Sequence, residues 1–202
     1  MIAPRISIVT PSYNQTSFIE EALQSVKDQR YPFLEHIVVD GASTDRTVSI
    51  LQEYSQRPGW QHLRWVSEPD QGQSDALNKG FRMAKGDIIG WLNSDDRYRR
   101  ACCETISKAR AKFPEVDILY GDYSYINEEG RCGASDGRSS SAALYCVTIT
   151  CFTYPRPLPF SGAASLTRAT GSTFAISMQW TTNSSSAYLT RAIDFSTYPG
   201  SH

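Results

Sequence analysis

The chain has 202 residues, 40% of them hydrophobic, and a formal net charge of −1, which suits one domain of ordinary size. This near-neutral charge, with no basic patch, argues against a nucleic-acid partner that is held through its phosphates. The apolar runs are shorter than the roughly 20 residues of a membrane helix and no signal peptide is evident, so we expect a cytoplasmic protein without a transmembrane segment, at most peripheral to the inner face of a membrane.

Short apolar runs in the first part of the chain predict β-strands. They are rich in β-branched and aromatic residues, which is typical of strands buried on both faces of a sheet, and they cover residues 5–10, 36–40, 63–68, 87–93 and 117–122. His36 and His62 flank these runs, and we expect both at the surface.

Helical patterns fill the intervals between these runs. We expect Ser43 or Thr44 to cap the second helix. Because strand and helix alternate, the sequence predicts an α/β fold with a mostly parallel, Rossmann-like sheet and helices on both of its faces. The apolar stripes of the helices are Phe18, Ile19, Ala22, Leu23 and Val26; Val48, Ile50, Leu51 and Tyr54; Ala76, Leu77, Gly80, Phe81 and Met83; Ile106, Ala109, Ala111 and Phe113.

Acidic residues stand at the carboxyl ends of the predicted strands, where ligands of open α/β sheets bind. Any one of them fits a helix cap or a turn equally well. Two are adjacent, however, and their repulsion is costly unless a cation relieves it. Carboxylates bind Mg²⁺ and Mn²⁺, which also bridge to substrate phosphates. The acids are Asp40, Glu68, the adjacent pair Asp95 and Asp96, and Asp122.

The loops after the first two strands indicate how a nucleotide is bound. The chain has neither the GxGxxG of dinucleotide-binding proteins nor the GxxxxGK[ST] of P-loop proteins. In TPSYNQ, Tyr13 can stack on a base, and Pro11 stiffens the backbone. In DGASTDRT, Asp40 can accept hydrogen bonds from a base or ribose, and Gly41 lets the chain turn close to it. With a metal beneath a diphosphate, these features describe a nucleoside-diphosphate site.

Three stretches carry a resemblance to the nucleotide-binding half of the family 2 glycosyltransferases, which have the GT-A fold. They are ISIVTPSYNQTSFIEEALQSVKDQRYPFLEHIVVDGASTDRT, SEPDQGQSDALNKGFRMAKGDIIGWLNSDD and ILYGDYSYINEEG, within residues 5 to about 130. The resemblance implies transfer of a sugar from a UDP- or GDP-linked nucleotide-sugar donor to a hydroxyl of an acceptor glycan or lipid-linked sugar. It implies inversion at the anomeric carbon and a part in polysaccharide biosynthesis.

The resemblance also implies roles for residues of the nucleoside pocket. Thr10, Pro11 and Tyr13 would line the base and ribose pocket. Asp40 would bind the base.

The acidic pair and the following helix complete the implied donor site. Asp95 would face the ribose or the metal and Asp96 the metal, so the resemblance implies a Mg²⁺ or Mn²⁺ cofactor. One departure is SDALNKG, in which Leu77 stands where many members have an arginine. This leaves a diphosphate contact without its usual residue, and we expect Asp75 to mark a subgroup with different donor contacts.

The composition changes near residue 132. Residues 1–132 hold 19 of the 21 acids and all five lysines, whereas residues 133–202 hold two acids and 23 serines and threonines. We predict a nucleotide-sugar-binding GT-A half-domain over residues 1–131 and an irregular tail over residues 132–202 that is not family-like. The GT-A fold would then be truncated.

The genetic code offers a hypothesis for this break. MQWTTNSSS, which begins at Met178, can be translated back into its possible codons. When these codons are read in a shifted frame, they permit the string AMDYEF. This string is close to an acidic run in the second half of similar family members. The same shift from Phe152 and from Ala192 also permits family-like strings. We therefore predict a frame shift near residues 130–132. The alternative is a genuine Ser/Thr-rich extension.

The break bears on catalysis. Transfer to a hydroxyl needs a general base, usually a carboxylate, and in this family the base comes from the later half of the domain. Only Asp136 and Asp194 are available there, in contexts that are not family-like. The catalytic base is thus unidentified, and we expect weak or no transfer. The alternatives are a non-catalytic nucleotide-binding remnant and a sugar nucleotidyltransferase, although TPSYNQ lacks the Gly-rich basic loop of the latter.

Overall fold

The computed structural model describes residues 3–114, 118–120, 126, 150–153, 165–168, 174–177 and 192–194. In the first part, strands and helices alternate as predicted, in the order β1 (Ile6–Ser12), α1 (Ile19–Lys27), β2 (Leu34–Asp40), α2 (Thr47–Gln56), β3 (Leu63–Ser67), α3 (Gln73–Met83), β4 (Ile88–Trp91), α4 (Cys102–Lys112) and β5 (Ile118–Tyr120). Short strands that were not predicted follow: β6 (Thr150–Thr153), β7 (Ser165–Arg168), β8 (Phe174–Ser177) and β9 (Ala192–Asp194). The predicted domain boundary at residue 131 lies outside the described residues and stays a prediction.

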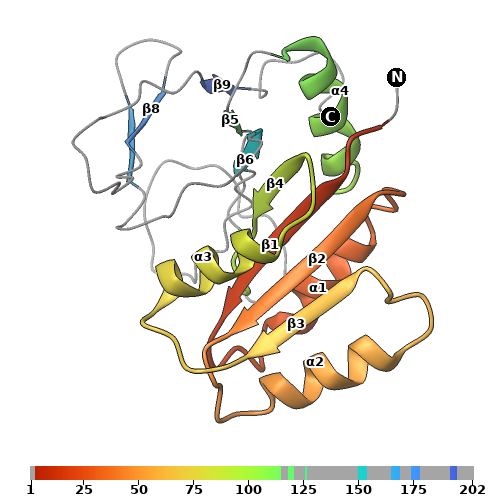
Figure 1. Cartoon of the computed structure of the whole chain (residues 1–202), viewed down its shortest axis with the longest axis vertical. Helices are drawn as coiled ribbons and strands as arrows, with labels where there is room; N and C mark the ends of the chain where they lie inside the picture. The colour runs from red at the N-terminus through yellow and green to blue at the C-terminus, as the bar shows by residue number, and fades with distance from the viewer. Residues whose placement is uncertain are drawn as a thin grey trace.

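The main sheet has the strand order β3-β2-β1-β4-β6-β5-β9. Strands β1 to β4 are parallel, which confirms the mostly parallel sheet expected for the α/β fold. Strand β6 lies antiparallel between β4 and β5, and β9 runs parallel to β5. Strands β7 and β8 form a separate antiparallel pair. Figure 1 shows β1 to β4 as neighbours, with β5, β6 and β9 beyond β4.

Helices cover both faces of the parallel strands. Alternate side chains of a strand point to opposite faces, so Ile6 and Ile8 of β1 pack against α1 and α4, and Val38 of β2 packs against α1 and α2. On the other face, Val9 and Val39 pack against α3. Figure 1 shows α3 in front of the sheet, α1 behind it, and α2 alongside β3. The predicted apolar stripes supply most of the buried faces of these helices. In α4, however, Ala111 is exposed, and the buried face also includes Cys102 and Cys103, which were not predicted.

Helix α3 approaches the sheet closely at Gly80. A Cβ atom built on Gly80 would lie 2.3 Å from Cγ1 of Val9 and 3.3 Å from Cγ2 of Val39. Side chains in a protein interior are close-packed, and the first of these distances is a steric clash. The missing side chain of Gly80 therefore sets how near α3 lies to β1.

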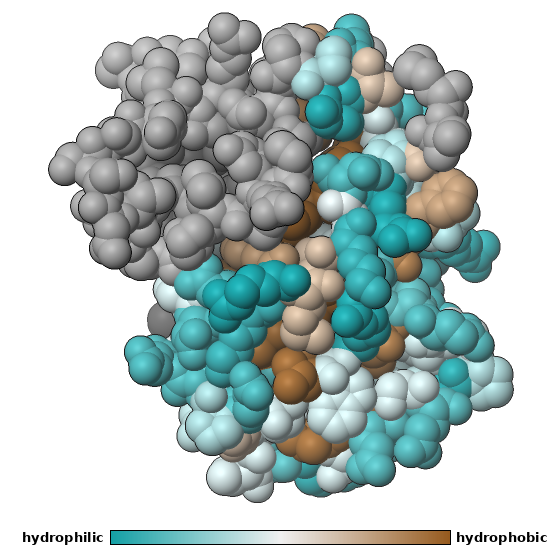
Figure 2. All heavy atoms as spheres, in the orientation of Figure 1, coloured by the Kyte–Doolittle hydropathy of each residue, from teal (hydrophilic) through white to brown (hydrophobic). Residues whose placement is uncertain are grey.

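The described part of the face in Figure 2 is largely hydrophilic. In Figure 2, hydrophilic side chains cover much of the described part of the face shown, and hydrophobic ones appear in patches between them. Among the described residues, the exposed large hydrophobic side chains are Tyr13, at 59%, and Phe33, at 45%. The described helices include none that is long and apolar enough to cross a membrane.

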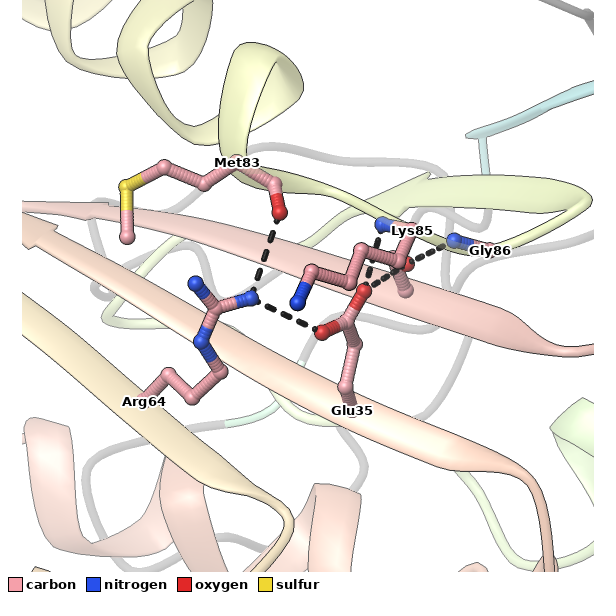
Figure 3. A network of polar contacts seen from close by, with 6 residues as sticks. Glu35, Arg64, Met83, Lys85 and Gly86 are labelled. Atoms are coloured by element: carbon pink, nitrogen blue, oxygen red, sulfur yellow. Dashed lines mark hydrogen bonds and ion pairs between the residues drawn. The ribbon is translucent and has the colours of Figure 1, made fainter.

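A polar network ties the end of α3 to the sheet (Figure 3). The Glu35 carboxylate accepts hydrogen bonds from the Ser7 hydroxyl and the Lys85 N–H, both at 2.6 Å. It also pairs with Arg64 at 3.1 Å, and Arg64 donates to the carbonyl of Met83 at 3.2 Å. Burial alone would raise the pKa of Glu35, but these hydrogen bonds outweigh burial and lower that pKa. The network joins β1, β2 and β3 to the turn between α3 and β4.

The prediction that His36 lies at the surface is wrong. Strand β2 begins before His36, so this residue is an interior position of a strand that helices cover on both faces, and it is fully buried. Its Nε2 lies 2.9 Å from the Thr10 hydroxyl.

The predicted cap of α2 is also wrong. The helix begins at Thr47, and no side chain makes a hydrogen bond at its N-cap position. The Ser43 hydroxyl donates to Asp40 instead. The Asp45 carboxylate accepts a hydrogen bond from the Thr47 N–H at 2.9 Å and so stabilises the helix start from outside the helix.

Candidate functional site

The carboxyl ends of the parallel strands meet at one edge of the sheet. Ser12 of β1 is opposite Asp40 of β2, and Asp40 is opposite Ser67 of β3. Strand β4 ends at Trp91, opposite Val9 of β1. The loops after these strands therefore converge, at the place where parallel α/β sheets bind their ligands.

A cavity of about 630 Å³ lies at this edge, between the loops and the first residues of α3. Its volume is in the range of small-molecule sites. It holds two carboxylates, and no lysine, arginine or histidine occurs among the described lining residues. A diphosphate there would need a cation, or the N–H groups at the start of a helix, to offset its charge. The lining residues are Pro11, Ser12, Tyr13, Gln15, Gly41, Pro69, Asp70, Gly72, Gln73, Ala76, Asn93, Ser94 and Asp95.

Three of the predicted site residues line this cavity: Pro11, Tyr13 and Asp95. The exposed ring of Tyr13 is open to stacking. The side chain of Asp95 is also exposed. The structure thus brings the loop after β1 and the loop after β4 to one space.

Thr10 and Asp40 do not line the cavity, because both are fully buried. The Thr10 hydroxyl lies against His36. Asp40 Oδ1 accepts a hydrogen bond from the Ser43 hydroxyl, and Oδ2 accepts from the Ser43 N–H at 2.9 Å and the Ser67 hydroxyl at 2.7 Å. Asp40 therefore joins the loop after β2 to the end of β3. A contact between Asp40 and a base would require this fully buried carboxylate to become accessible.

Asp75 lies in the first turn of α3 and outside the cavity lining. Its Oδ2 accepts a hydrogen bond from the Gln71 N–H at 3.2 Å and lies 3.4 Å from Lys79 Nζ. Lys79 also pairs with Glu68 at 3.0 Å, and this contact raises the pKa of Lys79. In this structure Asp75 stabilises the positive end of α3, and its role in a donor site stays a prediction.

Asp95 and Asp96 have different surroundings. Asp95 is exposed at the cavity, whereas Asp96 is 6% exposed and its Oδ2 accepts a hydrogen bond from Asn93 Nδ2 at 2.9 Å. Among the described residues, no group of three or more histidine, cysteine, aspartate or glutamate side chains is placed to hold a metal. Mg²⁺ needs no such cage, since it commonly binds one or two carboxylates, waters and substrate phosphates. An exposed carboxylate at a cavity whose described lining includes no basic side chain fits a cation of this kind.

Sequence patterns did not point to Asp70, which lines the cavity. Its Oδ1 accepts a hydrogen bond from the Gly72 N–H at 2.8 Å, in a turn where Gly72 has a φ of +102°. Such a φ favours glycine. Gly41 leaves room for Asp70, because a Cβ atom on Gly41 would lie 2.7 Å from Asp70 Oδ2. The signal in the sequence is the run DQG, since aspartate often bonds the backbone two residues on.

The cavity lining also includes polar residues that were not predicted from the sequence, among them Ser12, Gln15 and Gln73. Ser12 Oγ and Gln15 Oε1 are buried atoms with no hydrogen-bond partner among the described residues. Gln73 is the first residue of α3. These polar groups are available to a polar ligand in the cavity.

Comparisons with known proteins agree with this geometry. Residues 7–169 match the model of the family described as "Glycosyl transferase family 2". The chain is 41% identical over 97 residues to the uncharacterized glycosyltransferase Rv1514c of Mycobacterium tuberculosis, and the match covers 48% of this chain and 36% of that protein.

Two solved structures are similar in fold. The mannosyltransferase PcManGT from Pyrobaculum calidifontis, in complex with GDP-Man and Mn²⁺, is 30% identical with a TM-score of 0.53, and the match covers 63% of this chain and 36% of that one. S. aureus TarS 1-349, in complex with UDP-GlcNAc, is 26% identical with a TM-score of 0.51, and the match covers 68% of this chain and 37% of that one. The chain therefore spans well under half the length of each of these proteins.

Proposed function

Because the chain belongs to glycosyl transferase family 2, we propose that the cavity binds the nucleoside-diphosphate part of a nucleotide-sugar donor together with a divalent cation. The reaction that follows is transfer of the sugar to an acceptor hydroxyl, with inversion at the anomeric carbon. The composition of the cavity carries this proposal. The exposed Tyr13, the exposed Asp95 and the start of α3 line one space, and its described lining residues include no basic side chain.

The cavity offers a group for the base, the ribose and the phosphates of such a donor. The ring of Tyr13 offers a stacking surface for the base. The buried oxygens of Ser12 and Gln15 lack partners among the described residues and suit donors of a ribose or base. No side chain caps the start of α3. The Asp75 N–H donates to the Gly72 carbonyl at 3.0 Å, so the N–H groups of Gln73 and Ser74 are the ones that we propose for a phosphate.

Asp95 and Asp96 would hold the cation, for which we propose Mg²⁺ or Mn²⁺. When bound, the cation offsets the negative charge that develops on the departing diphosphate. Asp95 supplies an exposed carboxylate, and Asn93 holds the carboxylate of Asp96. The complex of PcManGT with GDP-Man and Mn²⁺ supports this choice of cation.

The proposed donor is UDP- or GDP-linked, since TarS was solved with UDP-GlcNAc and PcManGT with GDP-Man. The proposed acceptor is a hydroxyl of a glycan or lipid-linked sugar, in polysaccharide biosynthesis at the cytoplasmic side of a membrane or in the cytoplasm. Family membership argues against a sugar nucleotidyltransferase. A non-catalytic nucleotide-binding protein is the remaining alternative.

Calorimetric titration of the purified chain with UDP and GDP, with Mn²⁺ or with EDTA, tests the donor site. We expect one of the two nucleotides to bind with Mn²⁺ and to lose more than about tenfold in affinity with EDTA, which is about 1.4 kcal/mol. Asp95→Asn should cause a similar loss. The matched control is Asp87→Asn, an exposed acid before β4 whose carboxylate accepts from the Arg5 N–H. A wild-type chain that binds neither nucleotide, or an Asp95→Asn variant that binds like wild type, contradicts the proposal.

We further propose that the chain as written transfers sugar weakly or not at all. The acids beyond residue 132 are Asp136, which lies outside the described residues, and Asp194, the last residue of β9. The measurement is release of UDP or GDP from UDP- and GDP-sugars by the pure chain, which should stay at background. Measurable turnover would refute the impairment and leave the donor site intact. Binding without turnover would favour the non-catalytic alternative.

A further inference from the structure

The side-chain amide of Asn93 lies between three other side chains at the edge of the cavity. Its Oδ1 accepts hydrogen bonds from Trp91 Nε1 and from Gln73 Nε2, both at 2.9 Å. Its Nδ2 donates to Asp96 Oδ2 at 2.9 Å. Asn93 therefore connects the end of β4 and the first residue of α3 to a buried acid of the proposed metal site.

The chemistry of the indole fixes which way this amide faces. Nε1–H of Trp91 can only donate, so the Asn93 atom opposite it must be the oxygen. Nδ2 must then face Asp96, whose ionised carboxylate only accepts. A flipped amide would set oxygen against carboxylate and N–H against N–H, so both hydrogen bonds would be lost. Trp91 thus sets the polarity of the contact that Asn93 makes with Asp96.

The orientation of Asp96 depends on the same residue twice. The Asp96 N–H donates to the carbonyl of Asn93 at 3.2 Å, in addition to the side-chain contact. Rotation of the Asp96 carboxylate would break its bond to Nδ2 in a site where the acid is almost fully buried. Groups that hold metal ligands in this way commonly change metal affinity by about tenfold to a hundredfold when they are removed.

We propose that Asn93 is a positioning residue for the divalent cation. It fixes the orientation of the Asp96 carboxylate, and Trp91 and Gln73 fix the orientation of Asn93. This inference rests on the proposed function, because it assumes a cation at Asp95 and Asp96. Since Gln73 begins α3 and lines the cavity, it also couples the start of α3 to the acidic loop.

Binding of Mn²⁺, followed through the electron paramagnetic resonance of the free ion in the presence of UDP or GDP, is the first measurement. Asn93→Ala should weaken Mn²⁺ binding by about tenfold to a hundredfold. Trp91→Phe should weaken it less, because Gln73 still donates to Asn93. Trp65→Phe is the matched control, because Trp65 is an indole of β3 that packs against a different core cluster. Thermal unfolding of the metal-free variants verifies that each one folds.

A double-mutant cycle separates positioning from general damage to the site. If Trp91 acts through Asn93, Trp91→Phe has no further effect on Mn²⁺ binding once Asn93 is alanine. The indole N–H resonance of Trp91, in protein labelled with ¹⁵N-tryptophan, is a second readout that needs no turnover. It should shift when diamagnetic Mg²⁺ and nucleotide are added, and this shift should be lost in Asn93→Ala.

The outcomes distinguish this inference from the proposed function. If the wild-type chain binds neither Mn²⁺ nor nucleotide, both proposals are overturned. If the wild-type chain binds them and folded Asn93→Ala binds Mn²⁺ equally well, only the positioning role is overturned. Effects of Trp91→Phe that add fully to those of Asn93→Ala would likewise overturn it. A loss in Asn93→Ala with no additional loss in the double variant supports it.

Discussion

Two buried polar side chains of β2, His36 and Asp40, lie on the same face of the sheet because they are four positions apart in a strand. The Asp40 carboxylate accepts hydrogen bonds from Ser43 and Ser67. His36 has Nε2 against the Thr10 hydroxyl, but its Nδ1 has no partner among the described residues. Burial, and then the charge of the neighbouring His62, lower the pKa of His36 to about 3. The buried imidazole is therefore neutral near pH 7.

We expect this histidine to make the fold sensitive to acid. Between an ordinary pKa of 6.5 and about 3, the unfolded chain binds a proton that folded His36 does not bind, so stability falls as the pH is lowered through that range. The contribution is up to about 1.4 kcal/mol per pH unit. Urea unfolding at a series of pH values measures it. His36→Gln should flatten the slope, whereas His62→Gln, at a half-buried position, should keep most of it. An equal slope in wild type and His36→Gln would refute this prediction.

Residue types were easier to predict than their contacts. An acid at the end of an apolar run, or a few residues after it, indicates the end of a strand, and this pattern led to Asp40 and Asp95. Asp40 accepts hydrogen bonds from Ser43, in the loop after β2, and from Ser67, the last residue of β3. No local pattern encodes the second contact, because Ser67 is 27 residues away in the sequence. Asp70 was missed for the same reason, because it reaches the cavity beside a glycine from another loop.

Helix α2 depends on a side chain that precedes it. Asp45 accepts hydrogen bonds from the Thr47 N–H at 2.9 Å and the Thr16 N–H at 3.1 Å. Desolvation would raise the pKa of Asp45, but the hydrogen bonds from Thr47 and Thr16 outweigh it and lower that pKa to about 2. The stabilisation is therefore present above the ordinary pKa of 3.8 and is lost as the pH falls toward 2.

Removal of the Asp45 carboxylate should destabilise the protein by about as much as the loss of a helix-capping side chain. Asp45→Ala is expected to cost about 0.5–2 kcal/mol. Asp45→Asn keeps an acceptor and should cost less, so it is the matched control. Urea unfolding at neutral pH measures both variants. Equal losses in the two would show that the charge, and not the hydrogen bonds, stabilises the start of α2.

The close approach of α3 to β1 at Gly80 leads to a second prediction about a single helix. Gly80→Ala should destabilise the protein by about 1–3 kcal/mol, because its Cβ would collide with Val9. Alanine is otherwise the better helix former by about 1 kcal/mol. Arg82→Ala, at an exposed position of α3, is the control and should be nearly neutral. Val9→Ala combined with Gly80→Ala should recover part of the loss, and a Gly80→Ala variant as stable as wild type would contradict the clash.

The presence of the elements from β1 to β5 followed from the sequence, but their ends did not, and β6 to β9 were not predicted. Burial on both faces produces continuous apolar runs, and buried helix faces produce stripes, so both kinds of element were found. Strand β1 was predicted to end at Thr10, before Pro11, which cannot donate to a neighbouring strand. In the structure β1 continues to Ser12, with Pro11 opposite Val39, because the register with β2 persists to Asp40.

At the scale of the whole chain, the family match extends to residue 169, whereas the composition changes near residue 132. A shift of the reading frame near residues 130–132 remains our prediction for this change. Sequencing of the source gene across codons 125–140 tests it, and we expect one base to be missing or added. An unaltered frame would establish the Ser/Thr-rich extension as genuine. If a base is missing or added, the intact reading frame would encode an ordinary second half of the domain with a general base.

The place of β6 in the sheet has a consequence for synthesis on the ribosome. Strands β1 to β4 pair among themselves, with β3 at one edge and β4 at the other. The partner of β4 at its outer edge is β6, which is translated much later. N-terminal units fold first as a chain emerges. Until Thr150–Thr153 arrive, the apolar strand IIGW presents unpaired backbone groups that can pair with a strand of another molecule. We therefore expect the nascent chain to be more prone to aggregation than the finished protein, and its solubility to depend on how fast translation proceeds from β4 to β6.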